Sequence, residues 1–430
     1  MALGVLLNLA LSAAAQDPAA ALIGYWHNWN DANAPYLSLD QIDDRYNVIE
    51  LAFAEPLPGT TSAIEFTPDY EVPQDFMDRI AALRAAGKKV LISIGGANAT
   101  VQLNNQDERE QFVYLTMSML LTWGVDGLDI DLEGSSVSIT GGTITQPVDS
   151  TVIRLIDGLQ EIMVEYRQAT GRKLFLTMAP ETAYVLGGQS AFGGIWGAYL
   201  PIIHALRDSI DILQVQLYNS GSMYGIDGAI YEQGTADFIV SQTEAVIQGF
   251  NTGGGFFQGL RPDQVAVGLP ACNAAAGGGY TDTATVRAAM EYLLGEGPQP
   301  GSYTLQQPVG YPTLRGLMTW SINWDAVAGC DGAYGFAENY ERIFGDMSTS
   351  VDPNGASSLR IWPVPASVAL NFNMPIRGAI TIHDAVGRLV CNIQVAAAVQ
   401  QIVVSDLVAG TYVMRGSMDG HPFALPFVKE

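Results

Sequence analysis

Short apolar runs alternate with segments of helical periodicity from Leu22 to Gly345. Runs rich in Val, Ile, Leu and Phe predict buried strands, and apolar residues spaced three and four apart predict amphipathic helices. The predicted strands are Leu22–Trp26, Val48–Ala54, Lys89–Ser93, Asp126–Gly134, Lys173–Met178, Ile212–Tyr218, Gln264–Leu269 and Gly316–Trp320. The clearest helices are Phe76–Ala86, Glu108–Thr122, Val152–Thr170, Ala236–Gln248 and Thr283–Leu294. This alternation predicts an α/β fold, a parallel (β/α)8 TIM barrel.

The pattern changes after Gly345. Residues 347–358 are rich in Ser, Asp, Pro, Asn and Gly, which predicts a linker. The alternating runs beyond it are Leu359–Trp362, Val368–Phe372, Gly378–His383, Leu389–Val395, Gln401–Val404, Thr411–Gly416 and Phe423–Val428. Turn residues separate these runs, so we expect a barrel domain over residues 20–346 and a small all-β sandwich over residues 359–430.

The chain starts with an apolar run, Met1–Leu11, followed by the small residues Ser12–Ala15. This pattern predicts a secretory signal peptide over residues 1–15, and the run is too short to span a membrane. The positive charge that usually opens a signal peptide is missing, so an apolar terminus without that role remains the alternative.

The composition restricts the partners of the protein. The 430 residues include 44 acidic and 20 basic side chains, giving a net charge of −24. This charge argues against nucleic acid and anionic membranes as partners, whereas a neutral polymer is not repelled. Four histidines and three cysteines stand without metal-binding spacing, so the sequence implies no metal and no cofactor.

The candidate chemistry is concentrated in the predicted strand Asp126–Gly134. Because side chains alternate along a strand, Asp129, Asp131 and Glu133 share one face and the residues between them are apolar. Buried carboxyl groups this close cannot all ionise, so one is expected to keep its proton. Glycosidases need such a division between an acid and an anion. A solvated edge strand and a divalent-metal site remain the alternatives.

The stretch matches the pattern Asp-x-x-Asp-x-Asp-x-Glu, and the chain therefore resembles family 18 of the glycoside hydrolases, the chitinases. The resemblance implies that Glu133 is the general acid. Asp131 would orient the N-acetyl group of the substrate and stabilise the oxazolinium intermediate. Asp129 would be the buried partner of Asp131. Substrate-assisted enzymes of this kind differ from glycosidases in which two carboxylates carry out the reaction.

The predicted strands end in polar and aromatic residues suited to a sugar, and these ends resemble the family motifs from roughly Leu22 to Gly345. By resemblance, Tyr218 donates its hydroxyl to the acetamido carbonyl, and Trp320 is the floor of the central subsite. The residues grouped with Trp320 as substrate-binding are Gln216, Asn219, Met178, Tyr25 and Asp126, of which Asp126 also supports the strand. For each aromatic residue by itself, core packing is the alternative.

The cysteines and one loop refine this picture. Cys272 follows the seventh predicted strand and Cys330 the eighth, and these strands are neighbours in a barrel. In an exported protein we expect these two cysteines to form a disulfide, with Cys391 free. Few residues separate the seventh strand from its helix, which leaves no room for the extra α+β domain of many chitinases. A shallow, open groove and endo-acting, weakly processive cleavage are therefore expected.

The tail resembles the C-terminal sorting domain of the type IX secretion system of Bacteroidetes-like bacteria. The resemblance rests on Trp362–Ser367, Asp384–Gly387, Leu407–Tyr412 and Phe427–Lys429. The family more often has Asn at the position of Val364. A carbohydrate-binding or fibronectin-like module is the alternative, although Trp362 is the only tryptophan of the tail. The resemblance implies the bacterial secretion machinery as a partner.

Together these features predict a secreted, monomeric, retaining chitinase, extracellular or at the cell surface, that acts on chitin or N-acetylglucosamine oligosaccharides by substrate-assisted catalysis. An endo-β-N-acetylglucosaminidase acting on glycoproteins shares the signature and remains an alternative. The other alternative is a chitin-binding lectin on an inactive barrel. Such lectins typically lose the position of Glu133, which is present here together with Asp131 and Tyr218.

Overall fold

The computed structural model describes residues 20–345, 361–362, 365–384, 388–418 and 421–430. The chain divides into two compact units, residues 1–348 and 349–430. The predicted signal peptide and the predicted linker, residues 347–358, lie outside the described residues.

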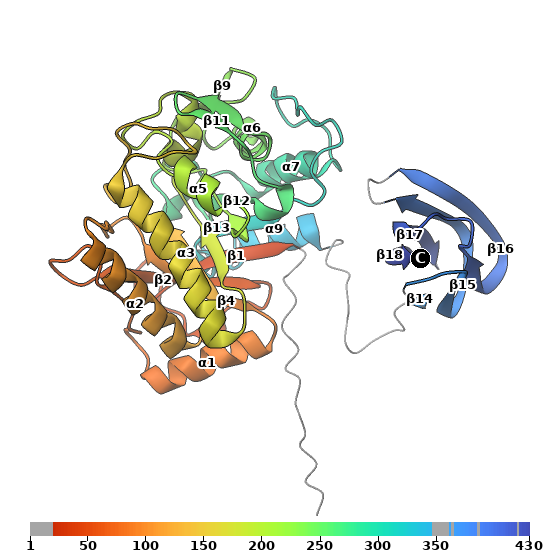
Figure 1. The fold of residues 1–430 in the computed structure, drawn as a ribbon, viewed down its shortest axis with the longest axis horizontal. Coiled ribbons are helices and arrows are strands. Elements are labelled where there is room, and N and C mark those ends of the chain that lie inside the picture. Colours follow the sequence, from red (N-terminus) through yellow and green to blue (C-terminus); the bar gives the residue numbers. More distant parts are fainter. Residues whose placement is uncertain (1–19, 346–360, 363–364, 385–387, 419–420) are drawn as a thin grey trace, which may run out of the picture. The chain divides into compact units, whose positions relative to one another are not determined.

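A nearly closed barrel of parallel strands is the centre of the first unit (Figure 1). In the order of their hydrogen bonding, the strands are β12 (Ala266–Pro270), β13 (Gly316–Trp320), β1 (Ala21–His27), β2 (Val48–Pro56), β4 (Lys89–Gly95), β5 (Gly127–Asp131), β6 (Phe175–Met178) and β7 (Ile212–Leu213). The bridges Leu213–Val265 and Gln216–Gly268 connect the segment of β7 to that of β12. The predicted (β/α)8 barrel is confirmed, although β5 and β7 are shorter than predicted.

Helices cover the outside of the barrel, and local sequence signals set their ends. They are α1 (Pro73–Ala85), α2 (Gln106–Trp123), α3 (Ser150–Thr170), α4 (Thr182–Val185), α5 (Leu200–Leu206), α6 (Ala236–Gln248), α7 (Thr283–Leu294), α8 (Ile322–Asp325) and α9 (Gly335–Phe344). The side chains of Asn105 and Asp282 accept backbone N–H groups at the starts of α2 and α7. Gly124, Gly171 and Gly295 adopt the left-handed conformation that ends α2, α3 and α7.

The alternation of side chains along the strands creates two apolar layers. Leu128 and Ile130 of β5 belong to the outer core, which also contains residues of α2 and α3. Asp129, between them, is completely buried without belonging to either apolar core. The inner core contains Ile23 and Met318 from β1 and β13. A carboxyl group inside the barrel therefore depends on polar partners contributed by other strands.

The loops around the barrel stay short or form small hairpins. β3 (Ile64–Glu65) pairs with the end of β2, β8 (Ser222–Tyr224) pairs with β9 (Ile230–Glu232), and β10 (Phe250–Thr252) pairs with β11 (Gly255–Phe257). Between β12 and α7, residues 271–282 contain a single 3-10 turn, Asn273–Ala275. Within the described residues, none of the helices has both the length and the hydrophobicity to cross a bilayer.

The second unit is an antiparallel sheet of five strands. They are β14 (Ile361–Trp362), β15 (Ala369–Asp384), β16 (Leu389–Val403), β17 (Gly410–Met418) and β18 (His421–Lys429). β15 and β16 each span two of the runs that were predicted as separate strands. The two long strands stay paired along their length because their register shifts between Asn371 and Gly378. Leu370 and Ile382, from the two halves of β15, share one core with Tyr412 and Phe427. The predicted all-β fold of the tail is confirmed, with fewer and longer strands.

Candidate active site

One amide brings the two terminal carboxyl groups of the signature together. β5 ends at Asp131, and Glu133 lies in the loop that follows it. Nε2 of Gln216 donates to Oδ1 of Asp131 and to Oε1 of Glu133, both at 2.9 Å. The same nitrogen lies 3.0 Å from the carbonyl oxygen of Ala179 at the end of β6. Gln216 therefore fixes the relative orientation of Asp131 and Glu133.

Burial and mutual repulsion favour protonated carboxyl groups here. Burial raises the pKa of Asp131 well above its usual value, and the negative charges of Glu133 and Asp129 raise it further. Burial also raises the pKa of Glu133, an effect opposed by the hydrogen bond from Gln216 and reinforced by the charge of Glu181. A half-buried carboxyl group with a raised pKa is suited to give a proton near neutral pH.

Asp129 lies beneath this pair and is completely buried. Its Oδ2 accepts hydrogen bonds from the hydroxyl groups of Tyr25 and Ser93, both at 2.7 Å. Its Oδ1 accepts one from Thr177 at 2.6 Å. Burial raises the pKa of Asp129, and these hydrogen bonds lower it in part.

Tyr25, which the resemblance grouped with the substrate-binding residues, lies inside the barrel. The side chain is 1% exposed, because β1 directs it into the barrel, and its ring packs beneath Trp320 with 5.5 Å between centroids. Its hydroxyl is occupied by Asp129. Tyr25 therefore supports the site from below.

Met178 and Asp126 also differ from the substrate-binding positions expected for them. Met178 is completely buried at the end of β6 and does not line the cleft. Asp126 precedes β5, so it lies at the opposite end of the strand from Asp131. Its Oδ1 lies 2.9 Å from nitrogens of both Arg84 and Arg172. Asp126 therefore belongs to an ion-pair cluster that anchors the strand.

A cleft of about 680 Å³ opens above the carboxyl groups. The predicted residues that line it are Asp131, Glu133, Gln216, Tyr218, Asn219 and Trp320. Phe53 and Trp29 add to its apolar surface, with Phe53 stacked on Trp320 at an interplanar angle of 14°. Burial and the neighbouring carboxylates raise the pKa of Tyr218, so its hydroxyl keeps its proton. Aromatic faces beside a few polar groups suit a ligand with apolar and hydroxylated surfaces.

Besides Glu55, Glu65 and Asp69, which line the cleft, two further acidic residues were not predicted as part of the site. Glu181 lines the cleft, and burial raises its pKa. Glu50 is completely buried inside the barrel. Its signal in the sequence was an acidic residue in the middle of the apolar run Val48–Ala54. Among the described residues that line the cleft, there is no Lys, Arg or His, so its carboxylates face no cation there.

Glycine allows the β4 loop to approach the acidic residues. Gly95 has φ +119°, and a Cβ atom there would lie 2.1 Å from the carbonyl oxygen of Asp131. The N–H of Gly96 donates to that same oxygen at 2.7 Å. A larger residue at position 95 would therefore push the backbone away from the end of β5.

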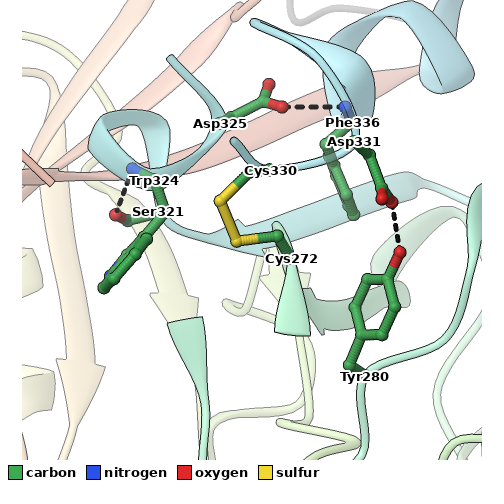
Figure 2. The surroundings of a disulfide bond; sticks show 8 residues. All are labelled: Cys272, Tyr280, Ser321, Trp324, Asp325, Cys330, Asp331 and Phe336. Carbon is green, nitrogen blue, oxygen red and sulfur yellow. Dashed lines mark hydrogen bonds between the residues drawn. A yellow bond between two sulfur atoms is a disulfide. The ribbon is translucent and has the colours of Figure 1, made fainter. Parts of the chain in front are cut away.

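A disulfide braces the rim next to the cleft. Cys272 and Cys330 are bonded, with 5.1 Å between their Cα atoms, and Cys391 is free. Figure 2 shows this bond between the loop after β12 and the loop after α8, beside the hydrogen bond from Tyr280 to Asp331. Ala275, three residues after Cys272, lines the cleft. Within the described residues, no group of three or more His, Cys, Asp or Glu side chains is placed to hold a metal ion.

Comparison with known proteins identifies relatives of both units. Residues 21–325 match the model of the glycosyl hydrolases family 18, and residues 360–422 match that of the secretion system C-terminal sorting domain. Chitinase Chi52 of Paenibacillus xylanexedens is 47% identical over 310 residues, and Chitinase D of Niallia circulans is 48% identical over 311 residues. Each match covers 71% of this chain, and the chain spans 58% of the length of these two relatives.

The fold also matches a solved structure. The crystal structure of a family 18 chitinase from Chromobacterium violaceum superimposes with a TM-score of 0.67 at 36% sequence identity. The match covers 76% of this chain and 84% of the other. The similarity is therefore that of the barrel as a whole, which includes the strands that carry the carboxyl groups.

Proposed function

The chain belongs to family 18 of the glycosyl hydrolases, and from this membership we propose that it is a chitinase that hydrolyses β-1,4 bonds between N-acetylglucosamine units. The family resemblance of the signature is confirmed, because residues 21–325 match the family model. Two relatives named chitinase share 47% and 48% identity with this chain. Their name supports chitin or its oligosaccharides as the substrate.

The single observation that carries the proposal is the position of two carboxyl groups on one amide. Asp131 and Glu133 both accept from Nε2 of Gln216 at 2.9 Å, within a cleft whose surface includes Tyr218 and Trp320. One carboxyl group can serve as the acid while the other acts on the acetamido group. The aromatic ring of Trp320 provides an apolar face against which the sugar held by the two carboxyl groups can pack.

The first step that we propose cleaves the glycosidic bond. Glu133 gives its proton to the glycosidic oxygen, and the bond from that oxygen to the anomeric carbon breaks with its electron pair remaining on the leaving sugar. The acetamido carbonyl oxygen of the same sugar attacks the anomeric carbon and forms an oxazolinium ion. Asp131 accepts the acetamido N–H and balances the positive charge, while Tyr218 donates its hydroxyl to the carbonyl oxygen.

The second step hydrolyses that intermediate. Glu133, now a carboxylate, takes a proton from a water molecule that attacks the anomeric carbon. The bond to the acetamido oxygen breaks, and its electron pair restores the carbonyl group. Two displacements on opposite faces leave the product with the original β configuration, as in other substrate-assisted glycosidases. The raised pKa of Glu133 supports this exchange of roles.

We propose endo-acting, weakly processive cleavage. The support is the short connection between β12 and α7, where residues 271–282 add no further domain to the rim. A groove that no extra domain encloses admits the middle of a long chitin polymer and releases the polymer after each cut. Products dominated by dimers in the first minutes of hydrolysis of long chitin would contradict this mode.

The match of residues 360–422 to a secretion sorting domain supports an extracellular or cell-surface location. We propose that this unit is recognised by the bacterial secretion machinery and that the barrel acts as a monomer. The carboxyl groups, Gln216 and the aromatic surface of the cleft all come from one chain, so the site needs no second copy. Retention of chitin by the isolated tail would instead favour a carbohydrate-binding module.

The test is hydrolysis of a soluble N-acetylglucosamine hexamer by the wild type and by Glu133→Gln, with the product anomers followed over time. We expect β anomers from the wild type and a loss of roughly 10²–10⁴-fold in kcat in the variant. Glu338→Gln, an exposed change on α9, is the matched control and should keep wild-type activity.

The other outcomes separate the alternatives. Binding of the hexamer without hydrolysis by the wild type would identify a lectin. Neither binding nor hydrolysis would direct the assay to glycoprotein glycans, the substrates of an endo-β-N-acetylglucosaminidase. Rapid release of α anomers would exclude the retaining mechanism.

A further inference from the structure

Glu50 is a completely buried acid that the proposed reaction does not use. It lies on β2 and projects into the barrel, where its hydrogen-bond partners are neutral groups. Nε2 of Gln214 lies 2.7 and 2.8 Å from its two carboxyl oxygens. The hydroxyl group of Thr177 lies 2.8 Å from Oε1. A carboxylate in this position would have no cationic partner among these contacts.

The hydroxyl group of Thr177 connects Glu50 to Asp129. Its oxygen is 2.8 Å from Oε1 of Glu50 and 2.6 Å from Oδ1 of Asp129. A threonine hydroxyl has a single hydrogen to donate, yet both distances are those of hydrogen bonds. The second hydrogen must come from a carboxylic acid. One proton is therefore shared within the Glu50–Thr177–Asp129 group.

The partners of Asp129 indicate where that proton resides. Asp129 faces three hydroxyl groups, those of Tyr25, Ser93 and Thr177, at 2.6–2.7 Å. Hydroxyl donors stabilise the ionised form of a carboxyl group. We propose that Glu50 carries the proton and donates it to Thr177, whose hydroxyl donates to Asp129, and that Glu50 is thereby a positioning residue for the Asp129–Asp131 pair.

Electrostatics around Glu50 agree with this geometry. Burial raises its pKa well above the usual value, and the charge of Asp129 raises it further, while hydrogen bonding with Thr177, Gln214 and Tyr25 lowers it in part. The charge of Glu50 is also among those that raise the pKa of Asp131. A neutral Glu50 therefore limits the negative charge beneath Asp131. The titratable groups that interact electrostatically with Glu50 include Tyr25, Asp129, Asp131 and Tyr218.

Infrared spectroscopy of the full-length chain tests the position of the proton without any substrate. We expect a carbonyl band of a protonated carboxyl group near neutral pH that is absent from Glu50→Gln. Isotope-labelled glutamate should shift this band, because it belongs to a glutamic acid. A wild-type minus Glu50→Gln difference spectrum without the band, or with a band that labelled aspartate shifts and labelled glutamate does not, would overturn the assignment. Neither result depends on the activity of the protein.

The positioning role rests on the proposed function and is tested by steady-state kinetics on the hexamer. The amide of Glu50→Gln can still donate to Thr177 and accept from Gln214, so we expect near wild-type kcat and an unchanged acid limb of the pH profile. Glu50→Leu can do neither, and its kcat should fall roughly 10–100-fold at similar KM. Thr177→Val removes the hydroxyl that connects Glu50 to Asp129, and it replaces Glu50→Leu as the test if that variant does not fold.

Glu244 offers a matched control. It is also completely buried, and it accepts hydrogen bonds from the hydroxyl groups of Tyr303 and Tyr311. It does not line the cleft. Glu244→Gln should therefore leave the pH profile unchanged. Full activity of Glu50→Leu would overturn the positioning role, and so would an acid limb of Glu50→Gln displaced to lower pH, because that shift would show that a charged Glu50 had been raising the pKa of its neighbours. Inactivity of the wild type would refute the proposed function while the infrared result stands.

Discussion

The phenolic hydroxyl of Tyr25 donates a 2.7 Å hydrogen bond to Oδ2 of Asp129, across 104 positions of the sequence. This bond joins the first strand of the barrel to the strand that carries the signature. It also defines Tyr25 as a support of Asp129, because the ring is 1% exposed and cannot offer a face to a sugar.

Tyr25→Phe tests that relationship. Removing the hydroxyl leaves Asp129 with one donor fewer, so we expect kcat on the hexamer to fall roughly 5–50-fold with little change in KM. Steady-state kinetics over a full range of substrate concentrations measure both constants. If Tyr25 were the wall of the sugar pocket, KM would rise instead, which would contradict its role beneath Trp320.

Gln216→Leu tests the amide that orients Asp131 and Glu133. We expect kcat to fall roughly 10–100-fold, because two carboxyl groups lose their common donor. The hydrogen bond from Gln216 lowers the pKa of Glu133, so its loss raises that pKa. An acid catalyst must be protonated, and the alkaline limb of the pH profile of kcat/KM should therefore move to higher pH. A limb displaced to lower pH would exclude this arrangement.

Trp320→Ala tests the aromatic floor. Its ring lines the cleft, so the loss of the proposed sugar contact should raise KM about 5–30-fold, with a smaller effect on kcat. Hexamer binding by Glu133→Gln and by the double variant Glu133→Gln/Trp320→Ala gives the same comparison without turnover. Unchanged affinity in that background would show that sugars bind elsewhere.

The disulfide between Cys272 and Cys330 closes a loop with a sequence separation of 58. Replacing both cysteines by serine should lower the free energy of unfolding by about 2–5 kcal/mol. Thermal unfolding of the oxidised protein measures this loss. Cys391→Ser is the matched control, since Cys391 is free and belongs to the other unit. Equal melting temperatures for all three proteins would refute a stabilising role.

His27 makes the barrel sensitive to acid. The ring is 2% exposed, stacks on Trp29 at 4.3 Å, and has no hydrogen-bond partner at either nitrogen among the described residues. Burial lowers its pKa to about 3. The unfolded chain binds this proton more readily, so stability from the neutral ring is complete above about pH 6.5 and is lost as the pH falls toward 3.

His27→Phe keeps the stacking and removes the titration. The wild type should lose up to about 4–5 kcal/mol more than the variant between pH 7 and pH 3. Urea unfolding at several pH values measures the difference. Parallel stability curves for the two proteins would show that another group controls the acid sensitivity.

Much of the architecture was predictable because it rests on local signals. Period-two alternation in β5 placed Asp129 and Asp131 on the inner face and Leu128 on the outer one, and this follows from strand geometry alone. Glycines marked the ends of α2, α3 and α7. The order of strands in a barrel brought the loops of Cys272 and Cys330 together.

The sequence by itself thus determined the barrel, the acidic strand and the all-β tail, since these depend on the periodicity of neighbouring residues. Only the tertiary structure decided the depth and the partners of each side chain. It buried Tyr25 beneath Trp320, placed Asp126 at the far end of β5, and connected Glu50 to Asp129 through Thr177. Alternation along a strand predicts that a side chain points inward. Its height in the barrel and its contacts depend on strands that are distant in the sequence, as the 127 positions between Glu50 and Thr177 illustrate.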